Sequence, residues 1–224
     1  MVLKGQYLER PVLIRVGELC LEGLYHRGDH VRPVLILPPH PQLGGSMDSP
    51  VVAELAWALT RAGHPTLRMN YRGVGASQGE WEGGEHDVGD LRQAVEHLAE
   101  TTGAAPEGGV ALVGYSYGAD LTLRALAGGL RAAAVILIAP PVTLLDPSEH
   151  LRVLPETFAR TGELVTFCGD EDEVAPPARV AEVFGLLGER HREERIPGAD
   201  HVFRVGLQSL GQQVAQAAGK PVRR

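Results

Sequence analysis

The sequence contains little cysteine and no long apolar run. Cys20 and Cys168 are its only cysteines, and they lie far apart in 224 residues without a metal-binding or redox spacing. Both fall in strand-like segments, which predicts two small buried hydrophobic side chains and no disulfide. No segment reaches the roughly 18 continuous apolar residues of a membrane helix, and residues 1–11 lack the apolar core of a signal peptide. A cytoplasmic protein without a membrane partner is therefore expected.

Clusters of basic residues are absent as well. Lysine and arginine together number 21, against 28 aspartate and glutamate residues, and the formal net charge is −7. A nucleic acid partner is not expected, because such a partner requires a basic surface. The sequence also shows no internal repeat, low-complexity linker or shift in composition. Residues 1–224 are therefore predicted to form a single domain, and no feature of them indicates an oligomeric state.

Short apolar runs alternate with helical patterns along the chain. Two antiparallel strands are expected at residues 12–16 and 19–25. The other apolar runs have the length and composition of buried parallel strands, with a more polar edge strand last. They cover residues 34–37, 65–70, 110–113, 133–138, 164–168 and, at the edge, 192–196. This alternation predicts an α/β protein with a mostly parallel sheet and helices on both faces.

Helical patterns separate the predicted strands. Ser49 is a candidate N-cap before Pro50, opening a helix to about residue 62. A second helix has one buried face, at the 3, 4, 3 spacing of Val88, Leu91, Val95 and Leu98. Two further helices are expected at residues 175–187 and 206–218.

The longest connection between predicted elements covers residues 139–163 and contains four prolines. It is expected to form either a surface excursion or a small lid over a functional site. About 25 residues are too few for a large cap domain, which predicts an open pocket.

One strand-like run leads directly into a reactive residue. Residues 110–118 read V-A-L-V-G-Y-S-Y-G, and a helical segment follows. Ser116 thus stands between Gly114 and Gly118 in the strand, turn and helix context of a G-x-S-x-G nucleophile elbow. Such a turn projects the serine hydroxyl above the sheet and points the next amide, that of Tyr117, into the site.

A serine hydroxyl needs a base, normally a histidine oriented by a carboxylate. His201 is the candidate base, because it follows the last predicted strand and comes after both the serine and the acid. Its neighbour Asp200 is an alternative partner. Asp172 is the candidate acid, in a loop at the carboxyl end of a predicted strand. The residues alone leave other acids open, namely Asp170, Glu171 and Glu173 in the same loop and Asp146 after the preceding strand.

The loop after residue 37 reads L-P-P-H-P-Q-L-G-G-S-M-D. Gly44 and Gly45 allow close approach of the backbone to a ligand, as an oxyanion hole requires. The amides of Gln42 and Tyr117 are the predicted donors, with the Leu43 amide as an alternative to the first. The glycines of residues 70–79 have the wrong spacing for a dinucleotide fingerprint, so no nucleotide cofactor is predicted, and no metal site either.

Together these segments resemble the α/β-hydrolase superfamily over nearly the whole chain. The shared landmarks are the motifs G-Y-S-Y-G, H-P-Q-L-G-G-S-M-D, N-Y-R-G-V-G-A-S-Q-G, G-D-E-D-E-V and G-A-D-H. More narrowly, the chain is similar to a group of small capless hydrolases with an H-P-x-x-G-G-S-M-D oxyanion loop. The resemblance implies an eight-stranded sheet and a catalytic triad of Ser116, Asp172 and His201. It favours Asp172 over Asp170 because the family acid typically stands three residues after a strand-ending glycine.

These residues predict a serine hydrolase that cleaves small to medium carboxylic esters through an acyl-serine intermediate, without a cofactor or metal. Thioesters are a second candidate substrate class. The alternatives are a non-catalytic scaffold with the same fold, or an acyltransferase or peptidase that uses the same triad. Tyr115, Tyr117 and Trp81 either line the pocket or pack within the fold.

Overall fold

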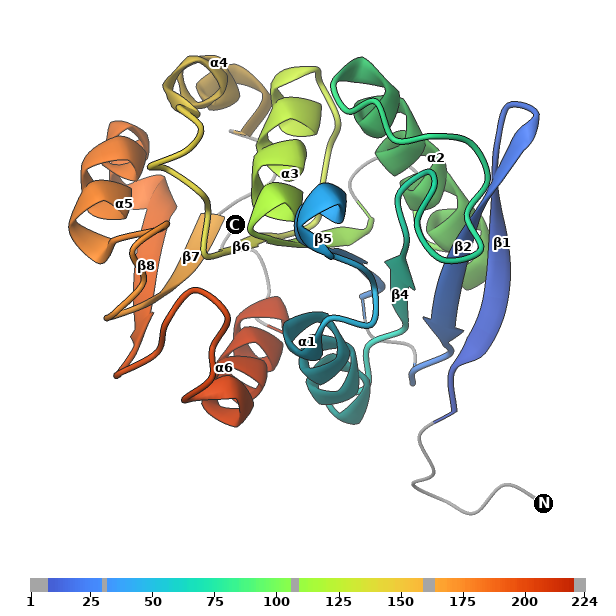
Figure 1. Cartoon of the computed structure of the whole chain (residues 1–224), viewed down its shortest axis with the longest axis horizontal. Coiled ribbons are helices and arrows are strands. Elements are labelled where there is room, and N and C mark those ends of the chain that lie inside the picture. Colours follow the sequence, from blue (N-terminus) through green and yellow to red (C-terminus); the bar gives the residue numbers. More distant parts are fainter. Residues whose placement is uncertain (1–7, 30–31, 106–108, 159–163, 220–224) are drawn as a thin grey trace.

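The structure is a computed structural model that describes residues 8–29, 32–105, 109–158 and 164–219. Parts of two expectations, on residues 1–11 and 139–163, lie outside the described residues. Within the described ranges, eight strands form one sheet in the order β1-β2-β4-β3-β5-β6-β7-β8 (Figure 1). The strands are β1 (Arg10–Val16), β2 (Leu19–His26), β3 (Val34–Leu37), β4 (Thr66–Met69), β5 (Ala111–Tyr115), β6 (Val135–Ile138), β7 (Leu164–Gly169) and β8 (His191–Ile196).

The strand directions divide the sheet into a small antiparallel part and a larger parallel part. β1 pairs with β2, and β2 with β4, in antiparallel register. Every pair from β4 to β8 is parallel. Every residue of β3, β5, β6 and β7 is buried, as expected for parallel strands covered on both faces. The predicted mostly parallel, eight-stranded α/β fold is confirmed, with β8 at the edge.

Helices cover both faces of the sheet. They are α1 (Pro50–Arg61), α2 (Glu85–Thr102), α3 (Tyr117–Ala127), α4 (Ser148–Phe158), α5 (Pro177–Phe184) and α6 (Leu207–Gly219). In Figure 1, α1 and α6 lie side by side on one face, and α2, α3 and α4 lie on the other. The predicted apolar stripe of α2 is buried at all four of its positions. No helix in the described part of the chain is both long and apolar enough to cross a bilayer.

One helix begins at the predicted residue but lacks the expected capping bond, and another ends earlier than predicted. Ser49 does stand at the N-cap of α1, but its side chain makes no capping bond. Its hydroxyl accepts a hydrogen bond from the Ser46 amide instead, at 3.2 Å. The helix predicted for residues 175–187 ends at Phe184 and continues as a 3₁₀ segment, Gly185–Arg190, in which Gly188 has a φ of 56°. A positive φ interrupts the helical hydrogen-bond ladder, and glycine adopts it at little cost.

The connection after β6 adds to the helical layer. Its central part forms α4, which packs against α3 (Figure 1). Leu151 and Leu154 of this helix are buried. This segment therefore extends the row of helices on one face of the sheet. The two cysteines are free, with Cys168 buried as predicted and Cys20 only partly buried on β2.

Candidate active site

The turn between β5 and α3 holds Ser116 in an uncommon backbone conformation. Its φ of 53° and ψ of −114° lie outside the regions favoured by side-chain-bearing residues. The two flanking glycines allow the turn to close. A Cβ on Gly114 would lie 2.3 Å from the Gly118 carbonyl oxygen, and one on Gly118 would lie 2.5 Å from that of Leu37. The spacing G-x-S-x-G is thus a steric requirement of this turn.

Replacing Gly118 with alanine should destabilise the protein. The added methyl group would press on the backbone of Leu37, which cannot move without distorting β3, so we expect a loss of about 1–3 kcal/mol in the free energy of unfolding. Gly89 is a matched control, because it lies within α2 and a Cβ there meets nothing within 4 Å. Gly89→Ala should stabilise the protein by about 0.5–1 kcal/mol. Urea denaturation measures both changes, and equal stability of the two variants would contradict this account.

Ser116, His201 and Asp172 form a continuous chain of hydrogen bonds. The Ser116 hydroxyl lies 3.0 Å from Nε2 of His201. On the other side of the ring, Nδ1 lies 3.0 Å and 2.9 Å from the two carboxylate oxygens of Asp172. The structure therefore brings together the three side chains that the sequence predicts to act as nucleophile, base and acid, although they are separated by 85 and 29 positions along the chain.

The surroundings of Asp172 determine which ring nitrogen of His201 carries a proton. The carboxylate is buried, and its Oδ1 also accepts hydrogen bonds from the amides of Val174 and Ala175, at 2.8 Å and 2.7 Å. A carboxylate offers only acceptors, so Nδ1 of His201 must be the donor in their contact. In the neutral imidazole, Nε2 is then an unprotonated acceptor for the Ser116 hydroxyl.

Two of the other candidate acids have different partners. Asp146 is exposed and accepts hydrogen bonds from the amide and hydroxyl of Ser148, at the start of α4. Asp200 accepts from the amide and guanidinium of Arg204. Asp170 is exposed on the loop after β7, two positions before Asp172. Among the described residues, Asp172 is the candidate acid whose hydrogen bonds reach the His201 ring.

Close packing joins the loop of Asp172 to the loop of His201. A Cβ on Gly169 would lie 2.1 Å from the carbonyl oxygen of Ala199, so the two backbones meet where only glycine fits. The Glu171 amide donates to the same Ala199 carbonyl at 2.9 Å. Tyr115 holds the loop of His201 at a second point, because its hydroxyl donates to the His201 carbonyl at 2.9 Å. Burial raises the pKa of Tyr115, which keeps this donor protonated.

The predicted oxyanion donors differ in how their amides are engaged. Tyr117 is the first residue of α3, where an amide has no acceptor within its own helix. The Gln42 amide, in the 3₁₀ turn Pro41–Leu43, donates to Nδ1 of His40 over a long 3.3 Å. The alternative donor, the Leu43 amide, closes that turn by donating to the His40 carbonyl at 3.0 Å. Gln42 is therefore the more available of the two.

The three aromatic candidates pack within the fold. The Tyr117 hydroxyl donates to the buried carboxylate of Asp87 at 2.5 Å, and Trp81 donates its indole N–H to the same oxygen at 3.0 Å. The rings of Tyr117 and Trp81 also contact the His40 ring edge-on, at centroid distances of 5.0 Å and 4.8 Å. Burial and the bond to Asp87 raise the pKa of Tyr117. His40 was recognised only as the first residue of the H-P-Q-L-G-G-S-M-D motif, and Asp87 belongs to none of the recognised motifs.

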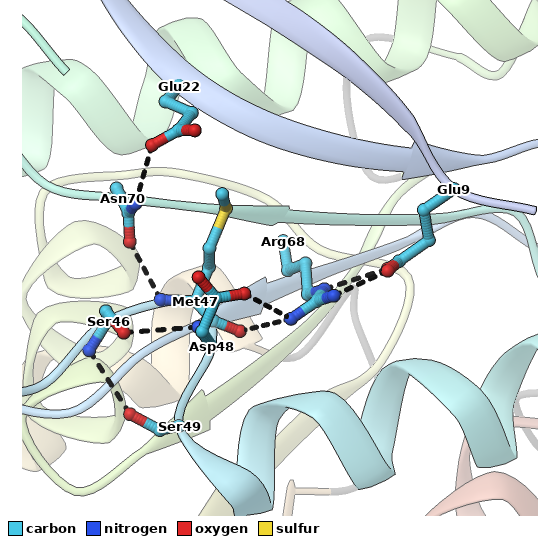
Figure 2. A network of polar contacts seen from close by, with 8 residues as sticks. All are labelled: Glu9, Glu22, Ser46, Met47, Asp48, Ser49, Arg68 and Asn70. Carbon is cyan, nitrogen blue, oxygen red and sulfur yellow. Dashed lines mark hydrogen bonds and ion pairs between the residues drawn. The ribbon is translucent and has the colours of Figure 1, made fainter. Parts of the chain in front are cut away.

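A polar network beside the 40–49 loop was also missed by the sequence analysis. It links Glu9 and Glu22 to Arg68 and Asn70, and through them to the backbone of Met47 (Figure 2). Met47 and Asp48 of the G-G-S-M-D motif and Asn70, the first residue of N-Y-R-G, meet in this network. The two motifs are separated along the chain by α1 and β4, so local patterns could not show that they meet.

Solved structures of serine hydrolases share this fold. An alpha-beta serine hydrolase homologue of Coxiella burnetii matches with a TM-score of 0.74 and 27% identity, over 96% of this chain and 98% of that one. A serine hydrolase without a lid from Xanthomonas campestris matches with a TM-score of 0.76 and 27% identity, over 94% of this chain and 93% of that one. The fold and these similarities define the protein as an α/β serine hydrolase.

More specifically, the chain belongs to the family described as serine aminopeptidase, S33, whose profile matches residues 44–165. An uncharacterised protein of Rickettsia prowazekii is 26% identical over 201 residues, which is 87% of this chain and 82% of that protein. The predicted membership of the α/β-hydrolase superfamily is thereby confirmed.

Proposed function

We propose that this protein hydrolyses small to medium carboxylic esters through an acyl-serine intermediate, with Ser116 as nucleophile, His201 as base and Asp172 as the acid that orients it. The observation that carries this proposal is the 3.0 Å contact between the Ser116 hydroxyl and Nε2 of His201, at the tip of a strained turn. A serine oxygen bonded to an unprotonated imidazole nitrogen can lose its proton as it attacks a carbonyl carbon.

The reaction then proceeds in two half-reactions. In the first, the Ser116 oxygen bonds to the ester carbon while its proton moves to Nε2 of His201. Collapse of the tetrahedral intermediate breaks the bond to the leaving oxygen, which takes that proton from His201. In the second, His201 removes a proton from water and the hydroxide adds to the acyl-serine. The carboxylic acid product then departs as His201 returns the proton to the Ser116 oxygen. Asp172 stabilises the charged imidazole in both.

Two backbone amides are proposed to hold the developing oxyanion. The Tyr117 amide lies at the amino end of α3, where the helix dipole also favours negative charge. The Gln42 amide would exchange its long bond to His40 for a bond to the oxyanion. This exchange is favourable, because a hydrogen bond to a full negative charge is about twice as strong as a neutral one.

Exposed apolar side chains support a substrate with an alkyl acyl group. Leu43 follows β3, Leu144 and Leu145 follow β6, and Val202 and Val205 follow β8, and all five are substantially exposed. Each stands in a connection after the carboxyl end of its strand, which is also the edge that carries Ser116. An apolar border of this kind would lower the cost of binding an alkyl chain, at roughly 25 cal/mol per Å² buried.

The family description gives one specific reason to consider amides as well. Its name refers to an aminopeptidase, and amide cleavage would use the same three side chains. An amine leaves only after protonation in a well-held geometry, and the described part of the chain forms no large cap to hold it. Ester cleavage is therefore favoured, with amino acid p-nitroanilides as the direct comparison.

The test is a panel of p-nitrophenyl esters from acetate to decanoate, followed by labelling with a fluorophosphonate. We expect turnover that depends on chain length, and a covalent adduct located on Ser116 by mass spectrometry. Faster cleavage of p-nitroanilides than of esters would reverse the choice between ester and amide. An inert Ser116 and no turnover of either class would favour a non-catalytic scaffold, and a product joined to added alcohol would indicate acyl transfer.

A further inference from the structure

The backbone of Met47 is held at both of its polar atoms by residues at the end of β4. The side-chain oxygen of Asn70 accepts a hydrogen bond from the Met47 amide at 2.8 Å. Arg68 donates to the Met47 carbonyl oxygen at 2.6 Å. Both bonds are buried, and Figure 2 shows them converging on Met47 from opposite sides. The 40–49 loop is thus attached to the sheet through this residue.

Glu22 on β2 determines which way the Asn70 side chain faces. Its carboxylate accepts from the Asn70 amide nitrogen at 2.9 Å and from the Ala76 amide at 2.8 Å. Because a carboxylate has no hydrogen to donate, the NH₂ group of Asn70 must point towards Glu22 and its oxygen towards Met47. Gly75 leaves room for this pair, since a Cβ there would lie 2.4 Å from the Glu22 oxygen.

Arg68 is a mostly buried cation whose charge is compensated on two sides. Its guanidinium forms paired hydrogen bonds with Glu9, at 2.8 Å and 2.5 Å, and lies 3.2 Å from a carboxylate oxygen of Asp48. A buried guanidinium would be costly without such partners. With them, it can hold a donor in a fixed direction towards the Met47 carbonyl.

Hydrogen bonds and close packing within the 40–49 loop connect the fixed Met47 to Gln42. The amides of Leu43 and Gly45 both donate to the His40 carbonyl at 3.0 Å, which closes the loop around Gln42. Gly45 packs so tightly that a Cβ would lie 2.3 Å from the Pro39 carbonyl oxygen. The segment between His40 and Gly45 is therefore a compact unit, and only Ser46 separates it from Met47.

We infer that Asn70 is a positioning residue for acyl transfer, which acts by holding Met47, and through it the Gln42 amide, where the oxyanion forms. Glu22 and Arg68 support it. This inference rests on the proposed function, because it needs the Gln42 amide to stabilise an oxyanion. Such donors act only when they lie about 2.7–3.1 Å from the developing charge, so a small displacement of the loop would be costly for turnover and nearly neutral for substrate binding.

The test compares Asn70→Ala with Ser77→Ala in the full chain. Ser77 accepts from the Glu22 amide at 2.9 Å and donates to the Asn70 carbonyl at 3.1 Å, so it bonds to the same two residues without touching Met47. We expect Asn70→Ala to lower kcat on the best p-nitrophenyl ester by about 10- to 100-fold with KM changed less than about threefold. In Ser77→Ala, kcat should stay within about threefold of the wild type. Equal kcat losses in the two variants, or full kcat in Asn70→Ala, would overturn the inference.

A second measurement does not depend on activity. Hydrogen exchange at the amides of Leu43 and Gly45 should accelerate in Asn70→Ala and remain unchanged in Ser77→Ala. If Asn70→Ala does not fold, Glu22→Ala frees the Asn70 side chain without removing it and should cause the same two changes, to a smaller extent. Unchanged exchange would show that Asn70 does not hold the loop. Wild-type protein that turns over no ester would instead overturn the proposed function, and the exchange result would still decide the attachment.

Discussion

Ser116→Ala is expected to lower kcat for ester hydrolysis by about 10⁶-fold, because it removes the atom that bonds to the acyl group. A residual rate above that of water should remain, since the amides of Gln42 and Tyr117 and the binding surface are left in place. The fold should be preserved. Alanine keeps the Cβ at the strained φ of 53°, and the hydroxyl makes its one described bond to His201.

Single-turnover and steady-state rates on the best p-nitrophenyl ester measure this effect, with thermal unfolding as the check on structure. Ser209→Ala is the matched control, because Ser209 lies on the exposed side of α6 and bonds only to Gln213 among the described contacts. It should react like the wild type and retain the fluorophosphonate adduct. A Ser116→Ala protein with more than about one hundredth of the wild-type kcat would place the nucleophile elsewhere.

Asp172→Asn is expected to lower kcat by about 10⁴-fold with little change in shape. The amides of Val174 and Ala175 both donate to Oδ1, so the carboxamide oxygen of the variant would take that position. Its NH₂ group would then face Nδ1 of His201 and donate to it. The imidazole would have to carry its proton on Nε2, and in that tautomer it cannot accept the proton of Ser116.

Asp170→Asn and Asp146→Asn are the controls for this assignment. Both residues were candidates for the acid from sequence, and both are exposed and without a described bond to His201. Their kcat values should stay within about threefold of the wild type, as is usual for surface changes that leave the reacting groups intact. A loss from Asp146→Asn comparable to that from Asp172→Asn would mean that His201 pairs with a different acid during the reaction.

Much of the fold could be predicted from short patterns. The buried parallel strands were recognised because a strand covered on both faces consists mostly of apolar residues along its whole length. The differences arose at element ends. Ser49 stands at the N-cap of α1 as predicted, yet its hydroxyl accepts from the Ser46 amide in the 40–49 loop and not from an amide in the first turn of the helix. Local sequence cannot rank those two partners.

The candidate site was predictable to different degrees. Ser116 could be identified because its turn needs glycine two positions before and after it, and this spacing is visible in sequence. The acid was ambiguous, because Asp170, Glu171, Asp172 and Glu173 are adjacent carboxylates of the same chemistry. Only the family resemblance favoured Asp172, and the structure shows it buried against two backbone amides and the ring of His201.

The sequence by itself determined the class of fold, the nucleophile elbow and the order of serine, acid and histidine, because each of these depends on neighbouring residues or on periodicity. The tertiary structure decided which carboxylate meets His201, which tautomer that ring adopts, and what holds the 40–49 loop. Those features depend on contacts between Asn70 and Met47 or between Gly169 and Ala199. Such contacts form only after the strands have paired, and local sequence patterns do not indicate them.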